Sequence, residues 1–273
     1  MIYEQKQDYF KKALDDGHIA ITGEGKNERI HYKAAKHSER WADPEEKSRA
    51  EFWAELIYKY EYRPDRIRFE VNVPRRTPND YADLVIYADK DEEYKSPYFV
   101  FEVKRADVSD AEFAQAIEQA CGNRASLGAP FCGAIAGLTR RLLRFDKYAA
   151  GERDRNHVTD IPIRYGKPPE WRFYKNKPGQ DLAAVPREEL RAAIRKCHQT
   201  LWEGGRRSPI AAFGEFCKII FVKHRDEKNP ERRDGEPYVF QRRDGESNSE
   251  LAARIRKLYA FEKEREPDVF TPD

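Results

Sequence analysis

The alternation of apolar and polar positions divides the first part of the chain into helical and extended segments. From Pro44 to Tyr60 the apolar residues recur at helical spacing, and Asp43 can cap the N-terminus of this segment. We therefore expect an amphipathic helix that packs on a sheet. Three runs rich in β-branched and aromatic residues follow, separated by turn residues, which predicts three consecutive strands. These strands are expected at Ile67–Val73, Tyr81–Ala88 and Tyr98–Lys104.

A second helix and two further strands are expected after these three strands. Between Asp110 and Gly128 the apolar positions again follow the helical period, and a glycine is suited to end the helix. The runs Cys132–Leu138 and Arg141–Tyr148 then have the composition of strands, and Trp171–Tyr174 is expected to add an edge strand. This order of elements predicts an α/β fold, a sandwich in which a central mixed sheet is flanked by helices.

The hydrophobic pattern changes character after residue 177, because every later apolar pattern has the helical period. Pro186 opens the first of three such segments, and Ser208 with Pro209 opens the second. The charged stretch Lys228–Glu246, between the last two, is expected to be an exposed loop. We therefore predict two domains, residues 1–177 with the mixed sheet and residues 186–273 as a C-terminal helical domain.

Composition limits the class of protein without identifying a ligand. The chain has 51 basic against 49 acidic residues, so any affinity for nucleic acid must come from a local patch. The four cysteines lie far apart without a C-x-x-C pair, which favours neither a zinc knuckle nor a disulfide framework. No apolar run approaches the roughly 18 residues of a membrane span, and the first residues lack the apolar core of a secretory signal. We expect a cytoplasmic protein without a membrane partner.

Three polar residues on the predicted strands form a candidate catalytic site. Asp83 lies early in one strand, while Glu102 and Lys104 lie two residues apart in the next and share one face. If the two strands are hairpin neighbours, the two carboxylates converge. Carboxylate oxygens, with the carbonyl oxygen of Val103, suit Mg²⁺, for which Mn²⁺ is the expected substitute. The ion would activate a water for phosphodiester hydrolysis, and Lys104 would orient that water or neutralise charge on the phosphorane.

The same pattern has an alternative interpretation, because E-x-K occurs by chance in many charged proteins. The three side chains could lie in solvent on the exposed face of an edge hairpin. The position of the residues favours a site. Asp83 follows a turn, and the run from Glu102 to Lys104 ends an apolar strand and precedes a helix.

Four segments also carry a resemblance to a known family. They are SRAEFWAELIYKYEYRPDRIRFEVNV, YADLVIY, FVFEVKR and AIEQACGNRASLGAPF. Through them, residues 43–174 resemble the N-terminal nuclease domain of type I restriction subunits and of related fused restriction–modification enzymes. An aspartate, an E-x-K strand and then a helical glutamine are typical of PD-(D/E)XK nucleases. The resemblance implies a restriction-endonuclease-like fold and a Mg²⁺-dependent deoxyribonuclease that acts on double-stranded DNA.

The resemblance further implies supporting residues around the catalytic three. In that family a glutamine on the helix after the E-x-K strand supports the site or contacts DNA, commonly as Q-x-x-x-Y. Gln119 takes the glutamine position, whereas Asn123 stands where tyrosine is expected. An acid on the first helix can assist, and Glu51 is the candidate, with Glu55 one turn away; Glu70 on the first strand is another. Alternatively, each of these acids is an ordinary exposed residue without a role in the site.

A basic run on the last predicted strand is a candidate DNA contact. Arg140, Arg141 and Arg144 either face DNA phosphates or form a solvated strand edge.

The C-terminal segments carry a different resemblance. The stretches IRKCHQTLWEGGRRSPIAAFGEFCKIIFVKHRDE and YVFQRRDGESNSELAARIRKLYAFEKEREPDVF resemble the helical segment before the S-adenosylmethionine domain of nuclease-fused DNA adenine methyltransferases. The chain contains neither N-P-P-[YF] nor a Gly-rich cofactor loop. The resemblance therefore implies a piece of a larger restriction–modification protein, with missing methyltransferase and specificity parts as partners. Two alternatives stay open: a catalytically inactive nuclease-fold module that binds DNA and couples recognition to methylation, and a stand-alone DNA repair nuclease.

Overall fold

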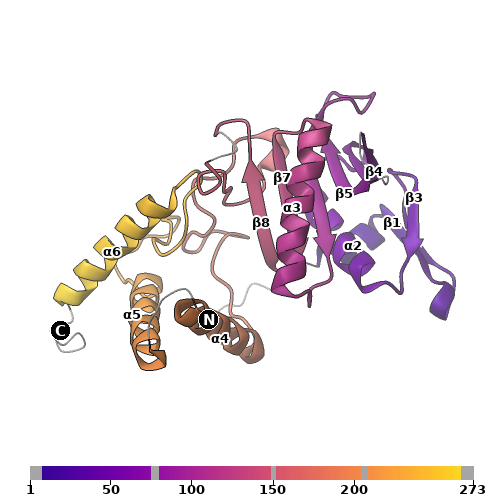
Figure 1. Cartoon of the computed structure of the whole chain (residues 1–273). Helices are drawn as coiled ribbons and strands as arrows, with labels where there is room; N and C mark the ends of the chain where they lie inside the picture. The colour runs from indigo at the N-terminus through magenta and orange to yellow at the C-terminus, as the bar shows by residue number, and fades with distance from the viewer. Residues whose placement is uncertain (1–7, 75–79, 149–151, 204–207, 266–273) are drawn as a thin grey trace. The chain divides into compact units, whose positions relative to one another are not determined.

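The computed structural model describes residues 8–74, 80–148, 152–203 and 208–265 (Figure 1). The chain divides into two compact units, one ending at Pro169 and the other beginning at Glu170. The first unit has a mixed α/β architecture, as the sequence predicts. Its helices are α1 (Tyr9–Asp15), α2 (Pro44–Tyr58) and α3 (Asp110–Leu127), with short 3₁₀ turns at Gly25–Asn27, Pro64–Arg66 and Ile163–Tyr165.

A five-stranded mixed sheet forms the centre of the first unit. Its order is β4-β5-β6-β7-β8, and only the β6–β7 pair is parallel. Helix α3 makes the long connection that a parallel pair requires. The predicted strands are confirmed, with ends shifted by a few residues. The strands are β4 (Ile67–Val73), β5 (Asp80–Tyr87), β6 (Pro97–Lys104), β7 (Phe131–Ala136) and β8 (Thr139–Arg144).

Helices α2 and α3 cover opposite faces of this sheet, because alternate residues of β6 pack into two different clusters. Phe101 packs with Phe52 of α2, with ring centroids 4.9 Å apart. Val100, its neighbour in the strand, packs with Ala120 of α3 instead. Figure 1 shows α3 lying in front of the sheet. The central strand is therefore buried on both faces, which explains its nearly continuous apolar sequence.

The predicted helix ends are also confirmed. The carboxylate of Asp43 accepts the backbone N–H of Glu45 at 2.9 Å and caps α2. Ser109 and Glu112 form a capping box at the start of α3, and Gly128 ends this helix with φ of +77°. A non-glycine residue rarely adopts that left-handed backbone, so this glycine fixes the turn from α3 into β7.

The hydrophobic pattern did not predict a second, three-stranded sheet near the N-terminus. It is antiparallel, in the order β1-β2-β3. Each strand has four residues, too few for a period of two to be distinguished from chance. Its inward side chains, among them Ile30 and Tyr32, belong to the main core beside α2. The strands are β1 (Ile19–Thr22), β2 (Arg29–Tyr32) and β3 (His37–Arg40).

The unit that begins at Glu170 contains the three helices expected from the periodicity. The segment Trp171–Tyr174 belongs to this unit and forms no edge strand, since it has only a bridge from Tyr174 to Pro237. The backbone carbonyl of Phe173, in the same segment, accepts the backbone N–H of Tyr238 at 3.2 Å. The boundary between the units therefore precedes the expected one at residue 177. The helices are α4 (Arg187–Glu203), α5 (Pro209–Glu227) and α6 (Asn248–Arg265).

The charged stretch between α5 and α6 differs from the exposed loop that we expected. The guanidinium of Arg232 pairs with the carboxylate of Asp226, and both side chains are buried. The buried carboxylate of Glu246 accepts from Arg254 of α6 at 2.8 Å. Part of the charge that suggested solvent exposure is thus taken up in internal ion pairs, which composition alone does not reveal.

Candidate active site

Strands β5 and β6 bring the two predicted carboxylates together. The antiparallel register pairs Leu84 with Phe101, so the next positions along the ladder are Asp83 and Glu102. The Oδ2 atom of Asp83 accepts the backbone N–H of Val103 at 2.7 Å. This hydrogen bond holds the Asp83 carboxylate against β6, beside Glu102. The expected approach of the two acids across a hairpin is therefore present in the structure.

Glu102 is fully buried, and only one of its carboxyl oxygens is hydrogen-bonded. Its Oε1 atom accepts from Nδ2 of Asn123, on α3, at 2.9 Å. Its Oε2 atom is shielded from solvent and has no hydrogen-bond partner among the described residues. Burial, followed by repulsion from Asp83, raises the pKa of Glu102 from 4.5 to about 9. A buried acceptor without a donor, next to a second carboxylate, suits a divalent cation.

Lys104 points its ammonium group toward the N-terminal end of α2. Its Nζ atom lies 3.1 Å from Oε1 of Glu45, and the side chain is partly exposed. Burial by itself would lower the pKa of Lys104, but the charges of Asp83 and Glu45 outweigh this effect and raise it. The site therefore holds a protonated amine near the acid pair at neutral pH.

Arg49 of α2 is a site residue that our sequence analysis missed. Its guanidinium lies 3.2 Å from Glu46, 3.6 Å from Asp83 and 3.7 Å from Glu70. These carboxylates raise the pKa of Arg49 even though burial opposes the shift. One signal was present in the sequence, because Arg49 lies four residues before the core residue Trp53, on the apolar face of the helix. A charge on such a face needs a buried partner.

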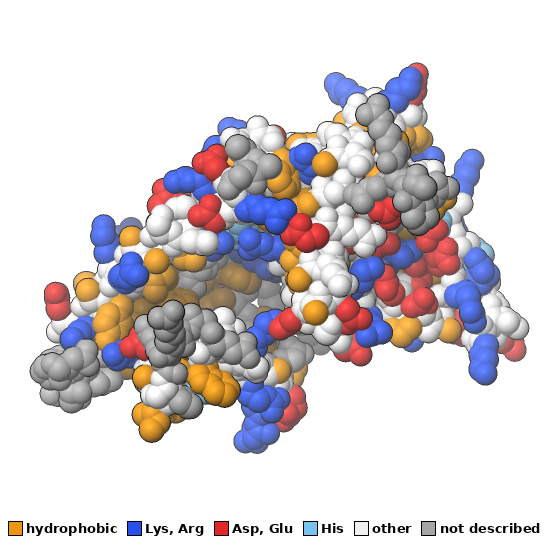
Figure 2. All heavy atoms as spheres, in the orientation of Figure 1, with side chains coloured by type: hydrophobic (Ala, Val, Ile, Leu, Met, Phe, Trp, Pro, Cys, Tyr) orange, Lys and Arg blue, Asp and Glu red, His pale blue; other side chains and the backbone are white. Residues whose placement is uncertain are grey.

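Acidic side chains outnumber basic ones around this site. Figure 2 shows Asp and Glu side chains gathered over α2 and the neighbouring strands β4 and β5, with Lys and Arg side chains beside them. The acids that contact Arg49, Lys104 or each other are Glu45, Glu46, Glu70, Asp83 and Glu102. Two cations thus face five carboxyl groups, an excess of negative charge that a metal ion can offset.

The remaining predicted supporting residues lie at different distances from the acid pair. Gln119 contacts Asp80 at the start of β5, with Nε2 3.5 Å from Oδ1, whereas the donor to Glu102 from the same helix is Asn123. Glu51 is exposed on α2, two positions from Arg49 and therefore on another side of the helix. Glu70 is half-exposed and contacts the site through Arg49.

Glu55 and Arg140 form a buried ion pair separate from the acid pair. The Arg140 guanidinium donates to both carboxylate oxygens of Glu55 and, at 3.3 Å, to the hydroxyl of Tyr60. Its side chain is 9% exposed and lies over the ring of Phe52. A DNA contact by Arg140 would have to compete with this internal pair, and it stays a prediction.

The two other arginines of the basic run also have partners within the protein. Arg144 forms a bidentate pair with Asp146, and its side chain is 11% exposed. Arg141 lies 3.3 Å from Nδ1 of His157 and is partly exposed. A DNA contact by either residue would have to compete with these interactions.

Comparison with known proteins matches part of the chain to a family. Residues 44–162 match the family model described as the N terminus of the type I restriction enzyme R protein. The match runs from the start of α2 to beyond β8 and includes Asp83, Glu102 and Lys104. A search of curated proteins gives no match. The family match supports the resemblance of this stretch to type I restriction subunits, whereas the methyltransferase-like resemblance of the C-terminal segments stays a prediction.

Among the described residues, no helix combines the length and the low charge that crossing a bilayer requires.

Proposed function

We propose that this protein contains the DNA-cleaving part of a restriction enzyme, a Mg²⁺-dependent phosphodiester hydrolase centred on Asp83, Glu102 and Lys104. The observation that carries the proposal is the meeting of two carboxylates across β5 and β6, with Oε2 of Glu102 buried and without a hydrogen bond to any residue that the structure describes. The match of residues 44–162 to the N terminus of the type I restriction R protein supports a role in restriction. Double-stranded DNA is the proposed substrate.

The residues at the acid pair fit a hard divalent ion. Asp83, Glu102 and the carbonyl of Val103 offer oxygen ligands, which Mg²⁺ prefers, and Mn²⁺ accepts the same set. When bound, the ion would polarise the phosphate and lower the pKa of a water molecule. The protein positions the two carboxylates by separate donors, the Val103 N–H for Asp83 and the Asn123 amide for Glu102. Such fixed ligands lose little freedom when the ion arrives.

Lys104 is suited to act on the reacting atoms. It follows Glu102 by two residues on the same strand, its ammonium is charged, and its side chain is accessible. In this role it would donate a hydrogen bond to the attacking water or to a phosphate oxygen as negative charge develops there. Glu45 holds the amine in the DNA-free protein, and Arg49 holds Asp83 from the other side.

A plasmid-nicking assay on the full chain tests this proposal. We expect nicking of supercoiled DNA that requires Mg²⁺ or Mn²⁺, with Glu102→Gln and Lys104→Ala each lowering the rate by about 100-fold or more. Matched controls are Glu93→Gln and Lys95→Ala, which remove the same charges in the exposed connection between β5 and β6. The controls should keep the wild-type rate. Nicking by Glu102→Gln at the wild-type rate would overturn the assigned site.

The same assay separates the proposal from a non-cleaving DNA-binding module. Wild-type protein that binds both Mn²⁺ and DNA but never nicks the plasmid would favour the coupling role. The methyltransferase and specificity parts of a larger restriction–modification protein remain proposed partners.

A further inference from the structure

A second group of metal-binding side chains lies outside the acid pair. His37 and Glu39 are two residues apart on β3, so they share a face of the three-stranded sheet. Glu70 comes from β4, in the five-stranded sheet. One ligand atom from each of the three lies within 4.8 Å of the others. The Nε2 atom of His37 is 3.5 Å from Oε1 of Glu39.

The backbone at Glu70 is bent at this point. Its φ is +47°, a left-handed conformation that is unusual for a residue other than glycine. The β4–β5 ladder records pairs for Phe69 and Val71 but none for Glu70 between them. Strain of this kind inside a strand is concentrated at functional sites. The bend therefore needs a reason, and a role of the Glu70 carboxylate as a ligand supplies one.

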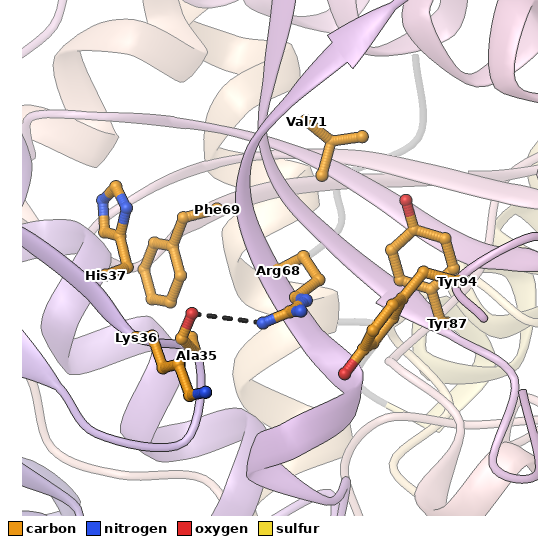
Figure 3. A pocket seen from close by; sticks show the side chains of 8 residues that line it. All are labelled: Ala35, Lys36, His37, Arg68, Phe69, Val71, Tyr87 and Tyr94. Atoms are coloured by element: carbon orange, nitrogen blue, oxygen red, sulfur yellow. Dashed lines mark hydrogen bonds between the residues drawn. The ribbon is translucent and has the colours of Figure 1, made fainter. Parts of the chain in front are cut away.

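The imidazole of His37 has a nitrogen available for a ligand. Its Nε2 atom is buried and makes no hydrogen bond with the described residues. The ring stacks on Phe69, with centroids 4.5 Å apart and planes within 6°, which fixes its orientation. Figure 3 shows the two rings side by side at one end of a pocket of about 360 Å³, with Arg68 in the middle and Tyr94 beyond. An imidazole nitrogen that is fixed in orientation and makes no hydrogen bond is a good ligand for a transition-metal ion.

The cations nearby leave negative charge on this group. Arg49 lies 3.7 Å from Glu70, the longest of its three carboxylate contacts, and shares its charge with the other two. Arg29 donates to the side chain and the carbonyl of Ser38. Glu70 therefore shares one guanidinium with Glu46 and Asp83, and a divalent ion would offset the charge of the Glu39 and Glu70 carboxylates.

We propose that His37, Glu39 and Glu70 bind a divalent transition-metal ion, of the kind represented by Mn²⁺ or Zn²⁺, which links the three-stranded sheet to β4. One imidazole and two carboxylates suit these ions, whereas Mg²⁺ prefers oxygen ligands alone. Ligand bonds of about 2.1 Å bring donor atoms about 3–3.5 Å apart, close to the present separation of His37 and Glu39. The ion would be structural, and its binding does not depend on nuclease activity.

Pulsed electron paramagnetic resonance of bound Mn²⁺ tests this site in the full chain. An Asp83→Asn/Glu102→Gln background removes the acid pair as a competing site. We expect this double variant to retain bound Mn²⁺ with a ¹⁴N coupling from an imidazole ligand. Adding His37→Gln should abolish the coupling and weaken Mn²⁺ binding at least about 10-fold. The matched control is His31→Gln on the adjacent β2, which should retain both signals.

A thermal-unfolding series in the same background provides an independent measurement. Because the proposed ion binds only the folded protein, Mn²⁺ should raise the melting temperature of the Asp83→Asn/Glu102→Gln variant. Glu39→Gln, which keeps the size of the side chain, should remove most of that increase. Absence of bound Mn²⁺ in the background, or a ¹⁴N coupling that survives His37→Gln, would overturn the proposal. Neither result would affect Mg²⁺-dependent nicking by wild-type protein, so this proposal and the nuclease assignment fail separately.

Discussion

The Glu102 carboxylate should destabilise the metal-free protein at neutral pH, and Glu102→Gln should remove that effect. Burial and the proximity of Asp83 raise the pKa of Glu102 from 4.5 to about 9. Between these two values the folded protein binds the proton more tightly than the unfolded chain does, so stability falls as the pH rises. This loss of stability is absent at pH values below the pKa of Glu102 in the unfolded chain. It is complete at pH values above the pKa of Glu102 in the folded protein.

The magnitude follows from the shift. Each pKa unit corresponds to about 1.4 kcal/mol, so three units above the unfolded pKa give an upper limit of about 4 kcal/mol at mildly alkaline pH. A glutamine at this position keeps a carbonyl oxygen for the Asn123 amide, and its own amide can donate to Asp83. We therefore expect Glu102→Gln to be more stable than wild type by roughly 2–4 kcal/mol near pH 7.5 without metal.

Urea unfolding in EDTA between about pH 5 and pH 9, followed by circular dichroism, measures this effect. The wild-type midpoint should fall with rising pH, the Glu102→Gln midpoint should change less, and the exposed control Glu93→Gln should follow wild type. Mg²⁺ should then stabilise the wild type and leave the variant nearly unchanged. Parallel pH profiles for wild type and Glu102→Gln, or a less stable variant at high pH, would refute the reasoning.

Three further substitutions test single contacts. Lys104→Ala should slow single-turnover cleavage by about 10²–10⁴-fold yet leave Mn²⁺ affinity unchanged by calorimetry, and lost affinity would contradict its role. Asn123→Ala should weaken Mg²⁺ binding by about 10–100-fold in the same calorimetric assay, because Glu102 loses its positioning donor. Arg140→Ala should lower the free energy of unfolding by about 3–5 kcal/mol in a urea titration, because the buried Glu55 loses its bidentate partner and keeps the single hydrogen bond from Lys59. A loss below about 1 kcal/mol would show that Lys59 and water are sufficient to stabilise the Glu55 carboxylate.

The elements that carry the acid pair could be predicted because their patterns are long and regular. Strand β6 spans eight residues of nearly continuous apolar sequence, and α3 has a capping box and a terminal glycine. Two strands joined by a short polar connection pair as neighbours, so the approach of Asp83 to Glu102 followed from strand order alone. Local sequence patterns were sufficient to predict the position of a residue wherever that position depends only on the strand or helix that contains it.

Tertiary partners could not be predicted in the same way. Arg140 lies in a basic run typical of a DNA contact, yet its partner Glu55 is 85 residues away on α2. Arg49 and Glu70 belong to separate elements that meet only after the sheet and helix have packed. The sign of a charge is visible in a sequence, but whether the charge faces solvent, a ligand or an opposite charge depends on long-range packing.

Asn123 departs from the family's Q-x-x-x-Y motif but can serve the same physical role. The resemblance predicted tyrosine four residues after Gln119, and position 123 holds an asparagine instead. Four residues along a helix return to the same face, so position 123 faces the sheet whichever residue it holds. The short amide fits a fully buried position and donates to Glu102, while Gln119 reaches the start of β5. What a buried carboxylate requires from this helix is a hydrogen-bond donor at the right distance, and either an amide or a hydroxyl can be one.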